Sequence, residues 1–295
     1  MLPVISAVVL AGLACIAWGA LVERRWYRLV RYRLDILPVR APLTVLHLSD
    51  LHFRRKDAAK ARFLATLPKT DVTVVTGDFL AEPDAVETAV AAVRATRGGL
   101  ASWFVLGSND LYVPRPLNPF KYFRRRRFPR HARRGRGADL SELLCADGWQ
   151  DLSNVRREVA LDGLPVELLG LDDAHIERQD LRLLPRRAAG RFGFAVMHSP
   201  DSAPEAAACG YDVIVAGHTH GGQIRLPLVG ALVTNSHMPR RLASGLIRIG
   251  GSWMSLSPGL GTSKYAPFRF LCRPEATLLD LRPSPQEHRG AVPAS

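Results

Sequence analysis

Six short apolar runs, each followed directly by polar side chains, constrain the fold of this chain more than any other feature. They lie at 43–48, 72–76, 103–106, 166–171, 194–197 and 213–216. Runs of this length that are rich in β-branched residues are typical of buried strands. Stretches of helical composition at 58–67 and 85–95 lie between some of them, and strands that alternate with helices predict an α/β fold. Shorter runs among Gly and Pro turns at 223–226, 246–249, 253–257 and 276–281 favour mixed sheets.

Side chains that bind metal ions follow five of these runs, where each predicted strand ends. They are Asp50 and His52, Asp78, Asn109 and Asp110, His198, and His218 and His220. In open α/β sheets, ligands bind outside the carboxyl ends of the strands. A single Asp or His at such a place is more often structural, but an ordered set of oxygen and imidazole donors favours a site for two divalent cations. The Asp-x-His and His-x-His spacings would send both side chains to one side of an extended backbone.

This ordered set (Asp-x-His, Gly-Asp, Asn, His, Gly-His-Thr-His) resembles the signature of the calcineurin-like metallophosphoesterases. The resemblance covers residues 43–281, and GHTHGGQ at 217–223 is its most specific part. It implies a layered α/β/β/α sandwich with mixed sheets. The sequence is most similar to the membrane-associated bacterial branch, which includes hydrolases of UDP-2,3-diacylglucosamine.

The resemblance also implies a role for each ligand. One cation would be held by Asp50, His52 and His220. The other would be held by Asn109, His198 and His218, and Asp78 would bridge the two. The cations would be Mn, Fe, Zn or Mg, among which mixed nitrogen and oxygen ligands do not discriminate. Together they would activate a water molecule for in-line attack on phosphorus.

The third strand departs from the family pattern. Relatives have Gly-Asn-His-Asp or Gly-Asn-His-Glu there, and the His helps to protonate the leaving group, whereas this chain has Gly107-Ser108-Asn109-Asp110. Alignment on Gly107 puts Ser108 at the ligand position. Alignment on Asn109 puts Asp110 in place of the His, and we prefer it because an amide oxygen binds a hard cation better than a hydroxyl. The candidate catalytic residues are then His218 and Asp110, which would need a raised pKa to act as an acid.

The segment at 3–22 carries no charge and is nearly all apolar. As a helix it would extend about 30 Å, which is enough to cross a bilayer. Basic residues follow it instead of preceding it, namely Arg24, Arg25, Arg28, Arg31 and Arg33. This order argues against a cleaved signal peptide and, by the positive-inside rule, puts the rest of the chain in the cytoplasm. We therefore predict a single-pass membrane protein with a transmembrane anchor at 3–22 and a basic juxtamembrane segment at 23–41.

The remaining chain divides into a metallophosphoesterase domain at 42–282 and a polar, Pro-rich tail at 283–295 that is expected to be disordered. An arginine-rich insertion lies at 120–137. The 40 Lys and Arg residues against 27 Asp and Glu give a net charge of +13, which favours anionic partners. Because the chain carries an anchor, we expect an anionic membrane surface as the partner, and nucleic acid is the less favoured one.

Several polar residues have a structural interpretation. His47 has the opposite parity to Asp50 and is expected to face away from the metals. Asp172 and Asp173 are expected to cap a turn, with His175 close by, although they could line the substrate cleft. The four cysteines are scattered and indicate no disulfide framework.

The leading hypothesis is a two-metal hydrolase of phosphoester or pyrophosphate bonds, acting on a phosphorylated substrate that is lipid-linked or close to the membrane. Without the family's histidine acid, it would favour leaving groups that need little protonation, such as a phosphate within a pyrophosphate. One alternative is a nuclease or nucleotide phosphodiesterase, which would explain the basic charge without lipid. The other is a catalytically weak, metal-dependent module that binds anionic headgroups.

Overall fold

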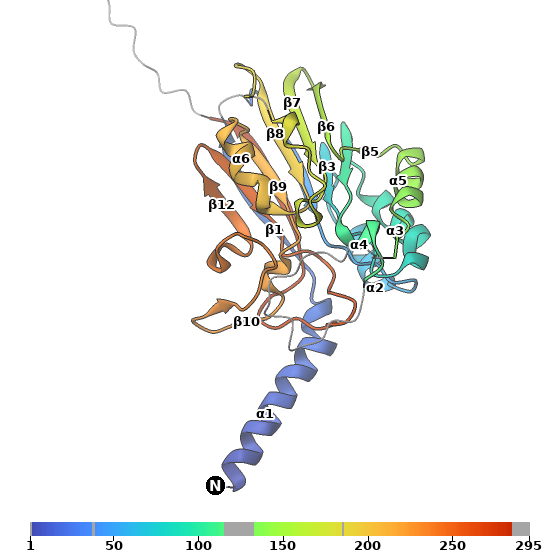
Figure 1. Cartoon of the computed structure of the whole chain (residues 1–295), viewed down its shortest axis with the longest axis vertical. Helices are drawn as coiled ribbons and strands as arrows, with labels where there is room; N and C mark the ends of the chain where they lie inside the picture. Colours follow the sequence, from blue (N-terminus) through green and yellow to red (C-terminus); the bar gives the residue numbers. More distant parts are fainter. Residues whose placement is uncertain (1, 37–38, 115–132, 185, 285–295) are drawn as a thin grey trace, which may run out of the picture.

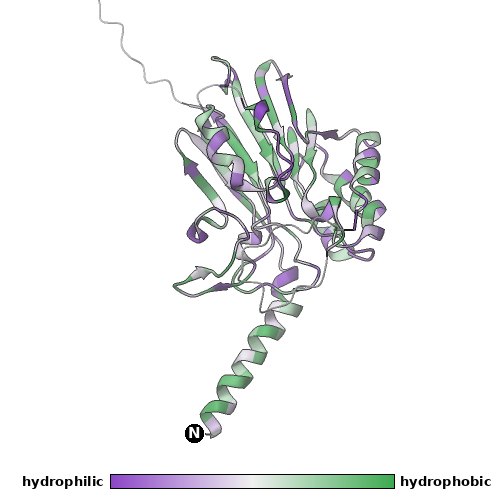
Figure 2. Ribbon diagram, viewed as in Figure 1, coloured by the Kyte–Doolittle hydropathy of each residue, from purple (hydrophilic) through white to green (hydrophobic). Residues whose placement is uncertain are grey.

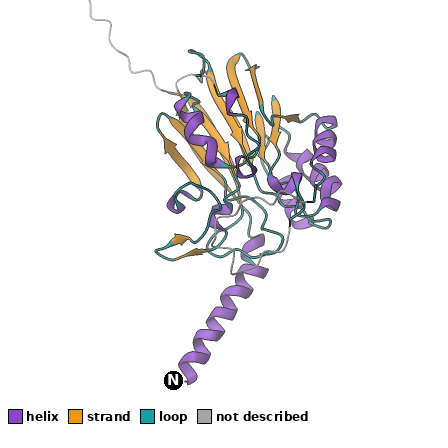
Figure 3. Cartoon of the chain, viewed as in Figure 1, coloured by secondary structure: helices purple, strands orange, loops and turns teal. Residues whose placement is uncertain are grey.

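Two six-stranded mixed sheets face each other in the computed structural model, and helices cover their outer faces (Figures 1 and 3). The structure describes residues 2–36, 39–114, 133–184 and 186–284. The arrangement confirms the predicted layered α/β/β/α sandwich. Each sheet contains both parallel and antiparallel pairs: the antiparallel pair of the first sheet is internal, and those of the second sheet lie at its two edges.

The first sheet carries the amino-terminal half of the domain. In order across the sheet its strands are β1 (Arg28–Ile36), β14 (Glu275–Pro283), β2 (Leu43–Leu48), β3 (Val72–Thr76), β4 (Ala101–Val105) and β5 (Gln150–Asp151). β1 is parallel to β14, β14 is antiparallel to β2, and β2 to β5 are parallel to one another. The outer face is covered by α2 (Ala58–Ala65), α3 (Val86–Val93) and α5 (Gly137–Ala146).

The second sheet is built from the carboxyl-terminal half. Its strands in order are β12 (Gly245–Ile249), β13 (Ser252–Leu256), β9 (Val213–Ala216), β8 (Phe192–Met197), β7 (Leu164–Leu171) and β6 (Val155–Leu161). Its outer face packs against α6 (Ala203–Ala208). The described residues also form two smaller elements, namely α4 (Ser108–Leu111) and the hairpin of β10 (Arg225–Leu226) with β11 (Gly230–Ala231).

The central strands are apolar on both faces because both faces are buried. In β2, Leu43 and Val45 face the second sheet, whereas Leu46 and Leu48 face the helices. Across the interface between the sheets, the rings of Trp103 and Phe194 lie 5.9 Å apart. Each such side chain contributes about 1.5–3 kcal/mol on burial, so the apolar runs of the sequence supply the main driving force for this sandwich.

Strands β1 and β6 were not anticipated from the sequence. β1 lies inside the expected juxtamembrane segment at 23–41, and Arg28, Arg31 and Arg33 point from it toward solvent. β6 also alternates exposed and partly buried residues along its length. Both are edge strands with one polar face, so their arginines hid the two-residue alternation that marks a strand.

Helix α1 (Leu2–Leu21) projects away from the sandwich (Figure 1). It is apolar on all sides (Figure 2), and the side chains of Val4, Val8 and Leu10 are about two-thirds exposed. A helix that is apolar all round is stable in water only when something covers it. Within the described residues, 3–25 is the one helical stretch long and apolar enough to cross a membrane, and almost none of it is buried against the domain.

Two predicted segments fall largely outside the described residues. Of the arginine-rich insertion at 120–137, the structure describes 133–137, which lead into α5. Of the tail at 283–295, it describes the end of β14 and the residue that follows.

His47 lies between the two sheets, in the structural role that was expected for it. Its Nε2 is 3.0 Å from Thr76 Oγ1 of β3, and its Nδ1 is 3.0 Å from Ser255 Oγ of β13. The ring is fully buried, and burial lowers its pKa from the ordinary 6.5 to about 3. His47 therefore joins the sheets as a neutral hydrogen-bonding group.

This burial makes the free energy of unfolding depend on pH. In the unfolded chain His47 takes up a proton below pH 6.5, but in the folded protein it stays neutral down to about pH 3. Its contribution to stability is therefore complete above pH 6.5 and is lost as the pH falls. Between about pH 6.5 and 5.5, wild type should lose about 1 kcal/mol more stability than His47→Gln, measured by denaturant unfolding in detergent. Equal losses in the two proteins would contradict this assignment.

Candidate metal centre

The predicted ligands lie in loops that directly follow strands, at one edge of the sandwich. Asp50 and His52 follow β2, and Asp78 follows β3, in the first sheet. His198 follows β8, and His218 and His220 follow β9, in the second sheet. The two sheets meet at this edge, so donors that are up to 170 positions apart in the sequence lie within a few ångströms of one another.

The backbone at these ligands is not extended, so the geometric reason expected for the two-residue spacings is wrong. Left-handed φ angles occur at Asp50 (46°), His52 (43°), Asp78 (54°), His218 (70°) and His220 (52°). Such angles are uncommon for residues other than glycine and mark sites where the surrounding structure holds the chain in a strained turn. The loops after β2, β3 and β9 therefore turn their side chains toward the site through left-handed residues.

Hydrogen bonds between neighbouring loops hold these turns in place. The backbone N–H of Asp50 donates to Gly77 O at 3.0 Å, and that of His52 donates to Asp78 O at 2.9 Å. Gly77 has a φ of 81°, and a Cβ there would lie 2.7 Å from His198 Nδ1. A glycine before Asp78 is thus required both by the backbone conformation and by the close approach of His198.

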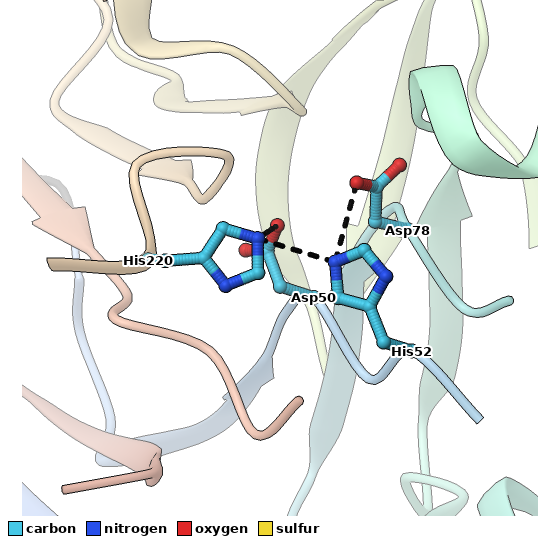
Figure 4. Close-up of side chains that lie close together, drawn as sticks. All are labelled: Asp50, His52, Asp78 and His220. Atoms are coloured by element: carbon cyan, nitrogen blue, oxygen red, sulfur yellow. Dashed lines mark hydrogen bonds and ion pairs between the residues drawn. The ribbon is translucent and has the colours of Figure 1, made fainter. Parts of the chain in front are cut away.

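Four buried donors form the first half of the site (Figure 4). The ligand atoms of Asp50, His52, Asp78 and His220 all lie within 4.8 Å of one another. His52 Nε2 is 3.2 Å from His220 Nε2 and 3.5 Å from Asp78 Oδ2. Asp50 Oδ1 is 3.5 Å from His220 Nε2. Two carboxylates and two imidazoles at these separations form a donor set suited to a divalent cation.

The donors of this half-site fit a metal ion on further grounds. Asp50 Oδ1 is buried and has no hydrogen-bond partner, which is costly for a carboxylate oxygen unless a cation lies against it. Burial lowers the pKa of His52 to about 4 and that of His220 well below its ordinary value. Both rings are therefore neutral near pH 7, and a neutral ring presents the lone pair that metal ligation needs.

The second half of the site lies on the other side of Asp78. His198 Nε2 is 3.6 Å from Asp78 Oδ1 and 3.3 Å from His218 Nδ1. The outer nitrogens of both rings meet backbone carbonyls, since His198 Nδ1 is 2.7 Å from Thr76 O and His218 Nε2 is 3.2 Å from Asn235 O. These carbonyls fix the ring orientations and leave the inner nitrogens facing the site.

Asn109 also contacts Asp78. Its backbone N–H donates to Asp78 Oδ1 at 2.8 Å, and its side-chain amide contacts Asp78 Oδ2. A half-turn of the amide would place its oxygen at the position of its nitrogen. Asp78 thus lies between the two groups of donors, with one oxygen toward His52 and the other toward His198.

The site without cations carries an excess of buried negative charge. Burial opposes protonation of His198, but Asp78, Asp173 and Asp50 outweigh it and raise the pKa of His198 to about 10. Burial is also the main reason that the pKa of Asp50 rises to about 6. Divalent cations would relieve the mutual repulsion of these carboxylates, so the electrostatics agree with the donor geometry.

Asp110, the acid expected from the sequence, is held by two backbone donors. Its Oδ2 accepts from the backbone N–H of Gly107 and its Oδ1 from that of Leu80, both at 3.0 Å. The carboxyl group is fully buried and caps the first turn of α4. Burial, with the charge of Asp78, raises the pKa of Asp110 to about 8, but its two oxygens are already engaged by backbone donors. The sequence could not show this, because a cap and an acid need the same residue type.

The loop after β7 brings two residues to the site that the sequence analysis did not assign to it. Asp173 Oδ1 accepts from His175 N at 2.8 Å, as a turn cap does, but its Oδ2 lies 4.0 Å from His198 Nε2. This oxygen is buried without a hydrogen-bond partner. The His175 ring lies 4.4 Å from that of His218. Asp172 pairs with Arg178 at 2.7 Å, whereas Asp173 both caps the turn and faces His198.

Comparison with known proteins identifies the family of this site. Residues 43–222 match the model of the calcineurin-like phosphoesterases. The chain belongs to this family. The matched region contains all of the donors described above, from Asp50 to His220.

Three relatives show how far the similarity extends. The phosphodiesterase YaeI of Escherichia coli (strain K12) is 28% identical over 266 residues, which cover 88% of this chain and 90% of the relative. The uncharacterized metallophosphoesterase YkuE of Bacillus subtilis (strain 168) is 27% identical over 241 residues, which cover 80% and 76%. A bovine transmembrane protein with a metallophosphoesterase domain is 28% identical over 82% of this chain and 54% of its own length.

The family and the donor geometry together define the class of enzyme. Calcineurin-like phosphoesterases use divalent metals, and the Asp and His cluster of this chain is compatible with a binuclear site. The protein is thus a metal-dependent phosphoesterase.

The unpaired oxygen of Asp173 makes a testable contribution to metal binding. Its charge faces His198, so Asp173→Asn should weaken binding of the second cation by about tenfold, as loss of a group behind a metal ligand commonly does. Metal content after gel filtration and calorimetric titration with Mn²⁺ would measure the effect. Asp172→Asn is the matched control, since Asp172 pairs with Arg178. Equal effects of the two substitutions would show that Asp173 only caps the turn.

Proposed function

We propose that this phosphoesterase hydrolyses a phosphodiester or pyrophosphate bond in a lipid-linked substrate at the membrane surface. The observation that carries the proposal is the position of α1, which joins the domain at the edge that holds the metal ligands. An enzyme held in this way has its catalytic edge toward the bilayer that the helix would cross.

Strand register supports this placement. β1 runs parallel to β14, with Arg28 opposite Glu275, and β14 runs antiparallel to β2, with Thr277 opposite His47. The amino end of β1 therefore lies beside the carboxyl end of β2. α1 leads into the first of these ends, and Asp50 follows the second.

Direct contacts join the helix to the site. Glu23, buried two residues after α1 ends, accepts from Cys272 N at 2.6 Å and from Trp18 Nε1 at 3.2 Å. Cys272 Sγ in turn donates to His220 O at 3.3 Å. A short chain of hydrogen bonds thus connects the apolar helix with a metal-site residue, so the helix and the site are held in a fixed relation.

The chain's own residues are suited to hydrolysis at phosphorus. Two divalent cations, when bound, lower the pKa of a water molecule and stabilise the negative charge that develops on the phosphoryl oxygens. Asp50, His52 and His220 would hold one of them, and Asn109, His198 and His218 the other, with Asp78 shared. Both carboxyl oxygens of Asp110 accept hydrogen bonds from backbone N–H groups, so Asp110 is poorly placed to protonate a leaving group. The site therefore favours leaving groups that need little protonation, such as a phosphate within a pyrophosphate.

The catalytic domain is proposed to lie on the cytoplasmic side. Arg24 and Arg25 follow α1 directly, and positive residues flank spans on that side. Alkaline phosphatase activity from a carboxyl-terminal fusion would place the domain on the opposite side.

A nucleotide or nucleic-acid phosphodiester is the second candidate substrate. The net charge of +13 favours such polyanions, and the relative from Escherichia coli is named a phosphodiesterase. Hydrolysis of a nucleotide or nucleic acid requires no membrane, so a comparison of lipid substrates with nucleotide substrates separates the two candidates.

The substrate proposal predicts a preference that depends on the bilayer. Full-length protein in nanodiscs with Mn²⁺ should hydrolyse a lipid pyrophosphate or lipid phosphodiester with a kcat/KM at least about tenfold above that for a soluble chromogenic diester, because the anchor confines enzyme and substrate to one surface. Asp78→Asn should abolish both activities. Asp212 directly precedes β9, at the end of the second sheet opposite the metal ligands, so the Asp212→Asn variant should retain both activities. Faster hydrolysis of single-stranded DNA or of a cyclic nucleotide than of any lipid substrate would overturn the proposal.

A further inference from the structure

We infer that the tip of the β10–β11 hairpin is a second membrane contact, which inserts into the leaflet surface beside α1. Three consecutive residues, Pro227, Leu228 and Val229, connect the two strands. The Leu228 side chain is completely exposed, and that of Val229 is 63% exposed. Among the residues that the structure describes, nothing covers these two apolar side chains at the end of the hairpin.

The backbone of the tip strengthens this interpretation. Leu228 has a left-handed φ of 64°, a conformation that is unfavourable for a residue with a bulky side chain. At the metal centre the same conformation turns ligands toward the site, but at Leu228 it turns an apolar side chain into open space. A glycine or asparagine would form this turn more easily, so the leucine is explained by a contact outside the domain.

Cationic side chains surround the base of the hairpin. Arg225 begins β10, and the short helical turn η9 (Arg240–Leu242) packs beside β11. Arg240 donates to Leu232 O at 3.0 Å and is exposed. Apolar residues at a tip with arginines behind them suit the boundary between acyl chains and anionic headgroups. The apolar tip and the arginines behind it therefore favour an anionic lipid leaflet as the partner.

The position of the hairpin agrees with this partner. It lies at the end of the domain from which α1 projects (Figure 1). Arg225 N donates to Phe270 O at 2.9 Å, and the adjacent Arg269 N donates to Gly19 O of α1 at 3.2 Å. One loop thus holds both the hairpin and the helix, so a bilayer crossed by α1 would meet the hairpin tip.

This contact would fix the orientation of the metal centre. A single helix anchors a domain but lets the domain tilt relative to the bilayer, whereas a second, separate contact restricts that tilt. The hairpin follows the metal-site residue His220 by only five positions, so its insertion would hold the ligand loop toward the leaflet. The inference rests on the proposed membrane location of α1.

A site-directed fluorescence experiment tests it. In a full-length background with Cys15→Ser, Cys145→Ser and Cys209→Ser, an environment-sensitive label is attached at Leu228→Cys. The protein is placed in nanodiscs of equal parts phosphatidylglycerol and phosphatidylcholine, with or without lipids that carry a quencher near the headgroup. Asp162→Cys is the matched control, because it lies at an exposed hairpin tip before β7, at the opposite end of the sheet. Val8→Cys reports on α1 itself.

We expect severalfold quenching at position 228 and none at position 162. A label at 228 that behaves like the label at 162 would overturn the inference. The label at position 8 then separates two failures: if it is quenched, only the hairpin contact is wrong, and if it is not, the membrane location of the enzyme fails as well. Shielding of 228 that depends on protein concentration and not on lipid would also overturn it, in favour of a protein partner.

Discussion

The antiparallel pairing of β14 with β2 determines the relation between the apolar helix and the metal centre. Within the described residues β14 is the last strand and β1 the first, and they run side by side at the edge of the first sheet. Because β14 runs antiparallel to β2, the helix that precedes β1 lies at the end of the sheet where Asp50 follows β2. β1 has 9 residues and is therefore roughly 30 Å long. If β1 ran in the opposite direction, α1 would join the domain at the other end of the sheet, about that distance from the metal centre.

A buried arginine consolidates this junction. Arg269 is fully buried, and its guanidinium donates to the carbonyl oxygens of Pro258 (2.7 Å), Gly261 (3.0 Å) and Cys272 (3.2 Å). Burial lowers its pKa, but the carbonyls supply the hydrogen bonds that an arginine needs when it leaves water. Gly261 N in turn donates to Asp50 O at 2.6 Å. The charge of one side chain therefore organises the loop that supports a metal-site residue.

Much of this arrangement could be predicted from the sequence, because buried parallel strands are apolar throughout and ligands follow their carboxyl ends. The apolar runs at 43–48, 72–76 and 213–216 coincide with β2, β3 and β9. The strand β1 was missed because its exposed arginines mask the alternation of its buried face. Asp173 was missed because one of its oxygens does cap a turn, and only the three-dimensional structure shows where the other oxygen points.

The claim that the metal centre faces the membrane can be measured without knowledge of the substrate. Full-length protein loaded with Mn²⁺ and freed of excess metal is placed in nanodiscs, and the phosphorus NMR linewidths of the lipids are compared with those of Zn²⁺-loaded protein, which is diamagnetic. We predict that Mn²⁺ broadens the lipid headgroup signals, because the ligands lie at the edge from which α1 leaves the domain. Identical linewidths in the Mn²⁺ and Zn²⁺ samples would show that the site points away from the bilayer.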